Sequence, residues 1–433
     1  MFILGGIASA VIALLILRAA PRITVVIWLV VLFFVPIWVG VQVGPFWSAA
    51  TLATILAIAT CSQSIELSPI DGIIAAFAVL VLVQFALGSI PLSGAFTPLS
   101  EWLLPYIWGR IVLTRVNLEF LVQAIALVAT ATAALAVLEW ATSTNYFVQI
   151  PPGNHGAFET WSPLQARGGS LRVEGAFGHS IALGATLSMC SAFVLAARWH
   201  VIVRLSLLSV VAAAVVLSLS RIGLVTFVLT LTLVILLLPG ISLASRIWTG
   251  AIGLAAAIMV IPYVSAVFLE AGNEAEGSAN YRLDLLSLLQ VLRPFGAVGE
   301  IAGLTVGGDY LGFFAHSIDN AFMHAALRLG WVPTLLLASA LILVAVSVIR
   351  RRGANVATVA VAAQIVGLFA VAFITQYTTF FWFAVGLAVA IGTVRPHSGE
   401  AELVTSDETA QSTIDFPTTD QPVNDAPDAW KRL

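Results

Sequence analysis

A long polar stretch between two groups of apolar segments decides how this chain is interpreted. It reads AGNEAEGSANYRLDLLSLLQVLRPFGAVGEIAGLTVGGDYLGFFAHSIDN over residues 271–320. The chain around it is mostly apolar: hydrophobic residues make up 60% of the sequence and charged residues 9%, and the mean hydropathy is +1.02. A soluble protein of this composition would expose large apolar patches and aggregate. The sequence therefore predicts an all-α polytopic membrane protein, with the polar stretch as the natural place for a functional site.

Apolar runs of membrane-spanning length occur on both sides of this stretch. A helix crosses a bilayer with about 20 mostly apolar residues, and by that criterion we expect about 12–13 transmembrane helices. The candidate segments lie near 2–17, 23–43, 47–61, 72–90, 99–113, 117–141, 178–197, 204–219, 222–239, 247–268, 320–349, 355–374 and 378–394. Glu101 and Arg110, together with two prolines, interrupt the segment at 99–113, which predicts a broken or re-entrant helix there.

Arginine placement orients these segments, because short cytoplasmic loops carry an excess of basic residues. With the N-terminus outside, the arginines of the cytoplasmic loops are Arg18, Arg22, Arg110, Arg115, Arg198, Arg204, Arg246, Arg350, Arg351 and Arg352. Residues 1–394 then form one transmembrane domain whose two long loops, 141–177 and 270–320, face outward. Residues 395–433 are rich in Ser, Thr, Asp, Glu and Pro and lack an apolar period, which predicts a disordered cytoplasmic tail.

Several common sources of chemistry are missing from the sequence. It contains no Walker loop, dinucleotide fingerprint, CxxC pair or HExxH helix. Cys61 and Cys190 fall in or near apolar runs, which argues against a disulfide or a metal site. The outer loops hold no Asp-x-Asp pair, so arginines would neutralise an anion there in place of a divalent metal. We therefore expect no metal, no cofactor and no nucleic-acid partner.

Arginines stand out in the first outer loop and just after it. Arg167 and Arg172 precede a helix in a glycine-rich segment, where glycines let the backbone approach a bulky ligand; the alternative is a flexible loop whose arginines meet lipid headgroups. His179, at the helix start, is more often a capping or packing residue than a catalyst. Arg221 lies between closely spaced apolar runs, where a central charge costs about 2.5–3.5 kcal/mol. It is therefore paired, ligand-facing or, alternatively, snorkelling to the boundary.

The polar stretch contributes further cations. Residues 281–293 predict a short amphipathic helix at the membrane surface, with Arg282 and Arg293 separated by about three turns and so on nearly one face, above Leu286 and Leu289. Six glycines follow, and then the segment that enters the next helix.

That helix entry holds three polar candidates. Asp319 and Asn320 suit an N-cap. His316 is a candidate general base or a candidate hydrogen-bond donor to a phosphate, although a lone loop histidine carries little information by itself. Together Arg172, Arg221, Arg282, Arg293 and His316 predict a cationic ring at the outer mouth of an apolar bundle. Such a ring suits an anionic headgroup on a long hydrophobic tail.

The order of short motifs around these residues is more specific than any one of them. It runs R-x-x-G-x-F at 172–177, S-R-x-G at 220–223, the Arg282 segment, a glycine-rich loop, A-H-S-x-D-N at 315–320 and R-L-G at 328–330. In this order the chain resembles the bacterial O-antigen ligase and O-antigen polymerase superfamily, over about residues 100–390.

The resemblance implies a C-type glycosyltransferase-like fold with about a dozen helices in the bacterial cytoplasmic (inner) membrane. It implies an active site on the extracytoplasmic face that transfers a glycan from an undecaprenyl (polyprenyl) diphosphate-linked oligosaccharide to a glycan or lipid acceptor, without a metal. Arg172, Arg221 and Arg282 look like the arginines that bind the diphosphate. His316 looks like the histidine that activates the acceptor hydroxyl or contacts the phosphate.

The resemblance leaves alternatives open. Many members have Asn-Pro where this chain has Gly178-His179-Ser180, and Asp319 with Asn320 favours a polymerase whereas His316 favours a ligase. A cell-surface polysaccharide polymerase is slightly favoured over ligase-type transfer. A membrane transporter of an anionic solute is the competing class, although transporters place polar residues at mid-membrane and here they crowd the outer boundary. A scaffold without chemistry is a third possibility.

Overall fold

The computed structural model of the chain describes residues 14–61, 65–167, 169–240, 285–299, 305–306, 309–310, 318–349 and 353–393, with scattered positions between 242 and 265. Several sequence-based predictions fall outside the described residues. They concern Arg282, His316, Arg350, Arg351, Arg352, the start of the first candidate span and the tail from 395.

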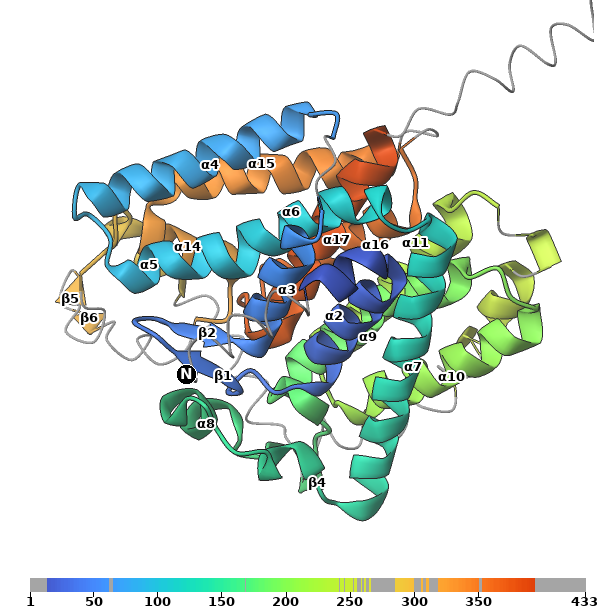
Figure 1. Cartoon of the computed structure of the whole chain (residues 1–433). Coiled ribbons are helices and arrows are strands. Elements are labelled where there is room, and N and C mark those ends of the chain that lie inside the picture. Colours follow the sequence, from blue (N-terminus) through green and yellow to red (C-terminus); the bar gives the residue numbers. More distant parts are fainter. Residues whose placement is uncertain are drawn as a thin grey trace, which may run out of the picture. The chain divides into compact units, whose positions relative to one another are not determined.

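The described residues are mostly helical (Figure 1). The helices are α2 (Pro21–Phe34), α3 (Ala49–Ala59), α4 (Pro69–Ala86), α5 (Leu92–Thr97), η1 (Pro98–Leu103), α6 (Leu104–Ile111), η2 (Val112–Thr114), α7 (Leu118–Thr142), η3 (Tyr146–Gln149), α8 (His155–Trp161), η4 (Gly175–Phe177), α9 (Ser180–Ala196), α10 (Val201–Leu217), α11 (Arg221–Leu237), η5 (Leu285–Val291), α14 (Ala321–Leu329), α15 (Trp331–Ser347), α16 (Val356–Leu368) and α17 (Thr375–Thr393).

Strands form short antiparallel hairpins in this part of the chain. They are β1 (Gly40–Gln42) with β2 (Phe46–Ser48), β3 (Ala166–Arg167) with β4 (Ser170–Leu171), and β5 (Thr305–Val306) with β6 (Asp309–Tyr310). In the first hairpin Gly40 pairs with Ser48 and Gln42 with Phe46. Gly44 has a positive φ of 66° in the connecting turn, a conformation that glycine adopts without strain.

Three of the described helices are long and apolar enough to cross a membrane by length and composition. They are α4, α7 and α17, and further apolar helices of 10–17 residues accompany them. The chain is thus an all-α protein with helices suited to a membrane, as its composition predicts.

Two candidate spans differ from the observed helices. The span at 23–43 is too long, because α2 ends at Phe34, Pro36 follows, and the first hairpin occupies residues 40–48. A proline has no N–H to continue a helical ladder. The span at 320–349 is two helices, which separate at Gly330 with φ 92°. A Cβ added at Gly330 would lie 2.5 Å from the carbonyl oxygen of Pro294, so the chain turns there at close contact with another segment.

The segment at 99–113 is not broken. Residues 92–111 run as α5, η1 and α6, and Pro98 and Leu104 both keep helical dihedral angles where these elements meet. The middle element, η1, is a π-helix. Pro98 cannot donate a backbone hydrogen bond, and the wider π turn accommodates this loss without ending the helix.

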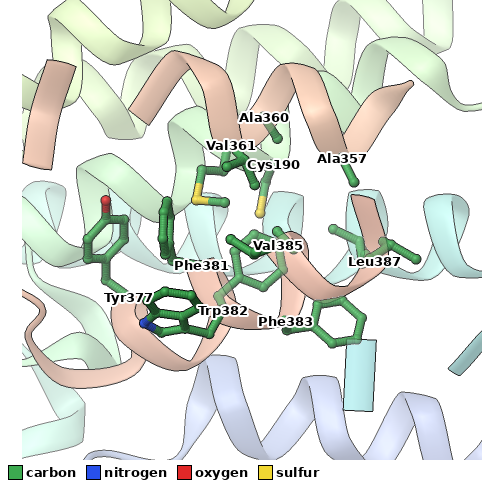
Figure 2. Close-up of a cluster of buried hydrophobic side chains, with 14 of the residues drawn as sticks. Cys190, Ala357, Ala360, Val361, Tyr377, Phe381, Trp382, Phe383, Val385 and Leu387 are labelled. Carbon is green, nitrogen blue, oxygen red and sulfur yellow. The ribbon is translucent and has the colours of Figure 1, made fainter. Parts of the chain in front are cut away.

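Helix α17 lies at the centre of the packing, with buried side chains along most of its length. The labelled side chains in Figure 2 are Cys190 from α9, Ala357, Ala360 and Val361 from α16, and Tyr377, Phe381, Trp382, Phe383, Val385 and Leu387 from α17. On another side, α17 meets α6 backbone to backbone. A Cβ added at Gly109 would lie 2.1 Å from the carbonyl oxygen of Phe383, and one at Gly386 would lie 2.1 Å from that of Tyr106. Small residues therefore set this helix spacing.

The arginines expected in cytoplasmic loops gather at one end of the helices. At the start of α7, Glu119 accepts a hydrogen bond from Arg198 (Oε2 to Nη1, 3.3 Å), and the guanidinium of Arg22 lies 5.4 Å from the ring centroid of Phe120. The described members of this arginine-rich end are Arg18, Arg22, Arg110, Arg115, Arg198, Arg204 and Arg246. The opposite end, which we call the loop end, carries Arg167, Arg172 and Arg221.

An ion pair between buried Arg110 and partly buried Asp71 lies at the arginine-rich end. Arg110 donates through Nε and Nη2 to the two carboxylate oxygens of Asp71, at 2.8 Å each. Tyr106 donates its hydroxyl to the same carboxylate at 2.5 Å, and Arg110 also donates to the carbonyl of Glu66 at 2.6 Å. These bonds join the start of α4 to the end of α6.

Candidate functional site

The first outer loop, named for the side of the membrane that the sequence predicts, is held against the turn between α10 and α11. Arg172 is 6% exposed; its Nε donates to the carbonyl oxygen of Ser218 (3.2 Å) and its Nη1 donates to Oε1 of Gln165 (3.0 Å). Arg167 donates through Nη1 to the carbonyl oxygen of Leu219 (2.9 Å). Arg221 is the first residue of α11, directly after this turn. The structure thus holds the two loop arginines against the turn that leads into the S-R-x-G motif.

The S-R-x-G motif has clear structural roles for two of its residues. The hydroxyl of Ser220 caps α11 by accepting from the N–H of Gly223 (3.0 Å). A Cβ added at Gly223 would lie 3.2 Å from Cα of Gly184, so this glycine lets α11 lie close to α9. Ser188 of α9 donates to the carbonyl oxygen of Gly223 across the same contact (2.8 Å). Ser220 and Gly223 therefore have structural roles in the motif, and Arg221 is its charged residue.

A buried carboxylate from α7 positions the loop segment beside Arg172. Glu139 is 3% exposed and accepts from the N–H groups of Glu174 (3.2 Å) and Gly175 (2.8 Å). Asn145 donates to Glu139 (3.1 Å) and to the carbonyl oxygen of Gly175 (3.0 Å). Gly175 has φ 56°, a left-handed conformation that suits glycine. These bonds fix the turn that follows Arg172.

Glu174 is fully buried next to this turn. Its carboxylate accepts from the N–H of Gln165 at 3.1 Å. Burial raises the pKa of Glu174 to about 8, against the lowering effect of that hydrogen bond; the charge of Glu139 raises the pKa further and Arg172 lowers it. At pH 7 the Glu174 carboxyl is therefore mostly protonated. It does not cancel the positive charge of Arg172.

His179 caps a helix in its neutral form. Its Nδ1 accepts from the N–H of Ile181 (3.2 Å) at the start of α9, and its ring packs edge-on against Trp161 at 6.0 Å between centroids. Burial, followed by the charge of Arg172, lowers the pKa of His179 to about 4. An imidazole with this pKa does not add a cation to the site at neutral pH.

A cavity of about 700 Å³ adjoins this cluster. Gln165 joins the two, because it lines the cavity and accepts the hydrogen bond from Arg172. The polar and aromatic side chains of the lining are Thr97 from α5, Glu101 and Trp102 from η1, Thr160, Trp161 and Gln165 from the first outer loop, His179 at the start of α9, Asp319, His324 and Arg328 from the α14 region, and Phe373 and Thr375 near the start of α17.

The end of the second outer loop reaches the cavity through Asp319. The next residue, Asn320, is the N-cap of α14: its Oδ1 accepts from the N–H of Met323 (2.9 Å) and its Nδ2 donates to the carbonyl oxygen of Phe369 (3.2 Å). The two adjacent candidates therefore differ, because Asn320 caps the helix and Asp319 faces the cavity. Arg293 lies elsewhere, at the start of α15, where its carbonyl oxygen accepts from the N–H of Trp331 (2.9 Å).

The predicted amphipathic helix at 281–293 is wrong in type over its described residues. The element is η5, a 3₁₀ helix over Leu285–Val291. Leu285 and Leu288 are buried, whereas Leu286 and Leu289, the predicted apolar stripe, are 55% and 54% exposed. A 3₁₀ helix has three residues per turn instead of 3.6, so Leu286 and Leu289 still share one face, which is the exposed face of η5.

Three ionisable lining residues were not among the sequence-based site candidates: Glu101, His324 and Arg328. The sequence contains a signal that could have identified these three residues. Glu101 is a carboxylate inside an apolar run, and His324 and Arg328 are four residues apart, which places them on one face of a helix. Ionisable groups in spanning segments are costly and mark candidate sites.

The assembled arrangement offers two chemical capabilities next to each other. Arg167 and Arg172, held by hydrogen bonds, and Arg221 at the start of α11 provide positive charge suited to an anion. The cavity beside them provides polar side chains and aromatic walls suited to a hydroxyl-rich ligand. Neither a family model nor a curated protein matches this chain.

Proposed function

We propose that the chain is a C-type glycosyltransferase of the bacterial cytoplasmic membrane. It moves or polymerises a glycan from a polyprenyl-diphosphate-linked donor at the outer face. One observation carries the proposal: Arg167, Arg172 and the start of α11 at Arg221 meet at the loop end, beside a cavity of about 700 Å³. A diphosphate needs cationic hydrogen-bond donors, a glycan needs a polar chamber, and a polyprenyl chain needs apolar helix faces. This end of the protein offers all three.

The reaction is displacement at the anomeric carbon of the donor sugar. The acceptor oxygen forms the new bond to that carbon while the bond to the diphosphate oxygen breaks, and the diphosphate leaves with the electron pair. Negative charge grows on the leaving group, so cations held in place beforehand lower the barrier. The hydrogen bonds of Arg172 to Ser218 and Gln165 hold its guanidinium in this way.

The arrangement of charge favours this function over transport of an anion. Transporters place their polar residues at mid-membrane in broken helices. In this chain the helix at 92–111 is continuous, and Arg167 and Arg172 bond to the carbonyl groups of the turn that ends α10. The charges of this cluster therefore lie at a helix end, where a lipid headgroup would meet them.

A product analysis separates the two glycosyltransferase activities. Purified protein in liposomes is incubated with a lipid-linked repeat unit, with and without a second lipid acceptor. A ladder of longer lipid-linked chains indicates a polymerase, which the adjacent Asp319 and Asn320 slightly favour. One transfer to the second acceptor indicates a ligase. A donor that stays intact under both conditions contradicts the proposed function.

A further inference from the structure

Three ionisable side chains of the cavity have no part in the reaction described so far. Glu101 comes from η1, and His324 and Arg328 come from α14. Arg328 lies close enough to Glu101 for their opposite charges to attract. Within the described part of the chain, none of the three side chains makes a hydrogen bond to another residue. Their polar groups remain available to a ligand in the cavity.

The local structure directs Glu101 into this cavity. It lies in the π-helix η1, and π turns are rare and often occur at functional sites. The next residue, Trp102, is buried and stacks against Trp382 of α17 (6.0 Å between centroids) and Phe77 of α4 (6.1 Å). Ser100 on the other side donates to the carbonyl oxygen of Phe96 (2.7 Å). Both neighbours are held by the helix and the core. Glu101 and Trp102 line the cavity, and of these two Glu101 is the ionisable residue.

The chain shows elsewhere how it builds an ion pair that only supports the fold. Asp71 and Arg110 at the arginine-rich end form two hydrogen bonds of 2.8 Å, and both have further partners. Glu101 and Arg328 attract each other without such bonds. A carboxylate kept in an apolar segment with its oxygens uncommitted costs stability, which is typical of a functional group.

We infer that Glu101 is the general base that accepts the proton of the acceptor hydroxyl. This inference rests on the proposed function. The acceptor O–H bond breaks and its proton moves to the Glu101 carboxylate, while the acceptor oxygen bonds to the anomeric carbon and the diphosphate leaves with its electron pair. The proton passes to solvent when the product departs. Arg328 orients the carboxylate and balances its charge. Glu101 thereby takes the base role for which the sequence offered His316.

The test compares Glu101→Gln and Glu101→Asp with wild type in the liposome assay. A positioned base contributes about 100-fold or more to rate, so Glu101→Gln loses at least about 100-fold in turnover while binding of the labelled lipid-linked donor is unchanged. Glu101→Asp, which keeps a shorter carboxylate, transfers at a rate between the two. Glu119→Gln is the matched control: it lies at the arginine-rich end, bonded to Arg198, and keeps the wild-type rate.

Azide provides a readout that a purely structural role of Glu101 would not give. Azide is a nucleophile without a proton to lose, so it needs no base. In Glu101→Ala, added azide attacks the anomeric carbon, a C–N bond replaces the bond to the diphosphate, and a glycosyl azide accumulates. Wild-type turnover in Glu101→Gln, or donor binding without glycosyl azide in Glu101→Ala, overturns the role of Glu101 alone. Wild-type protein that leaves the donor intact overturns the proposed function and, with it, this inference.

Discussion

Arg172 has a structural role in the fold and a proposed role in binding the diphosphate. Its backbone N–H donates to the carbonyl oxygen of Gln165, and its side chain donates to the same residue's amide and to the carbonyl of Ser218. A planar guanidinium makes such bonds in fixed directions, whereas a lysine ammonium is a point charge on a flexible chain. The position therefore requires arginine and not only a positive charge.

Arg172→Lys tests this requirement. We expect turnover of the lipid-linked donor to fall about 10-fold or more, because removing one charge-stabilising donor group typically costs at least that. Arg198→Lys, an exposed arginine at the opposite end, should keep the wild-type rate. Turnover assays on detergent-purified variants of equal purity make the comparison. A wild-type rate in Arg172→Lys would mean that the planar set of guanidinium donors of Arg172 is not required for turnover.

Glu174 predicts a pH dependence of stability. Its pKa is about 8 in the folded protein against 4.5 for an ordinary glutamate. Between these values the folded protein holds a proton that the unfolded chain releases, so stability falls as pH rises through this window and levels off above about 8. Glu174→Gln removes the titration. We expect its Tm to gain about 2 °C or more on wild type between about pH 5 and pH 8. A Tm difference that stays constant across this range contradicts the buried, protonated carboxyl.

Helix contacts add constraints that single residues do not show. The close meeting of α6 and α17 depends on Gly109 and Gly386, where an added Cβ would lie 2.1 Å from a backbone oxygen of the other helix. Because the opposing atoms are backbone, neither helix can yield by changing a rotamer. The contact also sets where α6, and with it η1 and Glu101, lies relative to α17.

Gly386→Ala tests this contact against a control on the same helix. We expect it to lose about 1–3 kcal/mol or more of stability, because the helices must move apart. No described atom lies within 4 Å of a Cβ added at Gly392, so Gly392→Ala should keep the wild-type Tm. Thermal unfolding followed by circular dichroism in one detergent measures both. Equal Tm values for the two variants would refute the close contact.

Apolar runs predict most helices well because a spanning helix must be apolar along its length. The expected segment at 117–141 is α7 at 118–142, and the segment at 178–197 is α9 at 180–196. The pattern does not distinguish a π-helix at Pro98–Leu103 or a 3₁₀ helix at Leu285–Val291, because these depend on which backbone hydrogen bonds close.

The site is less predictable from the sequence than the helices. The arginines at 167, 172 and 221 can be found as costly charges near the outer boundary. The cavity cannot be predicted from the sequence, because it exists only where η1, the first outer loop and α14 pack together. Glu101 and Arg328 come from distant parts of the chain, and nothing local in either segment indicates that they line the same cavity.

At the scale of the whole transmembrane domain, charge divides the helices into two ends. The described arginines expected in cytoplasmic loops share one end, and Arg167, Arg172 and Arg221 share the other. Such a division is what the positive-inside bias produces when the loop end faces outward.

Cysteine labelling tests this orientation. In a Cys61→Ser background, Gly156→Cys in α8 at the loop end should react with a membrane-impermeant maleimide in intact cells whose outer membrane is permeable to it. His200→Cys at the arginine-rich end should react only after the inner membrane is opened. The native Cys190 is buried and should stay unlabelled. The reverse labelling pattern would place the site on the cytoplasmic side.

The central claim is that the loop end activates a polyprenyl-diphosphate-linked glycan, whatever the acceptor. Its most direct test is the release of free polyprenyl diphosphate from a lipid-linked oligosaccharide by purified protein, measured by mass spectrometry. We predict steady release by wild type and by the distant control Arg198→Ala, and a loss of about 100-fold or more in Arg172→Ala and Arg221→Ala. No release by wild type, or equal release by all four proteins, would contradict the account.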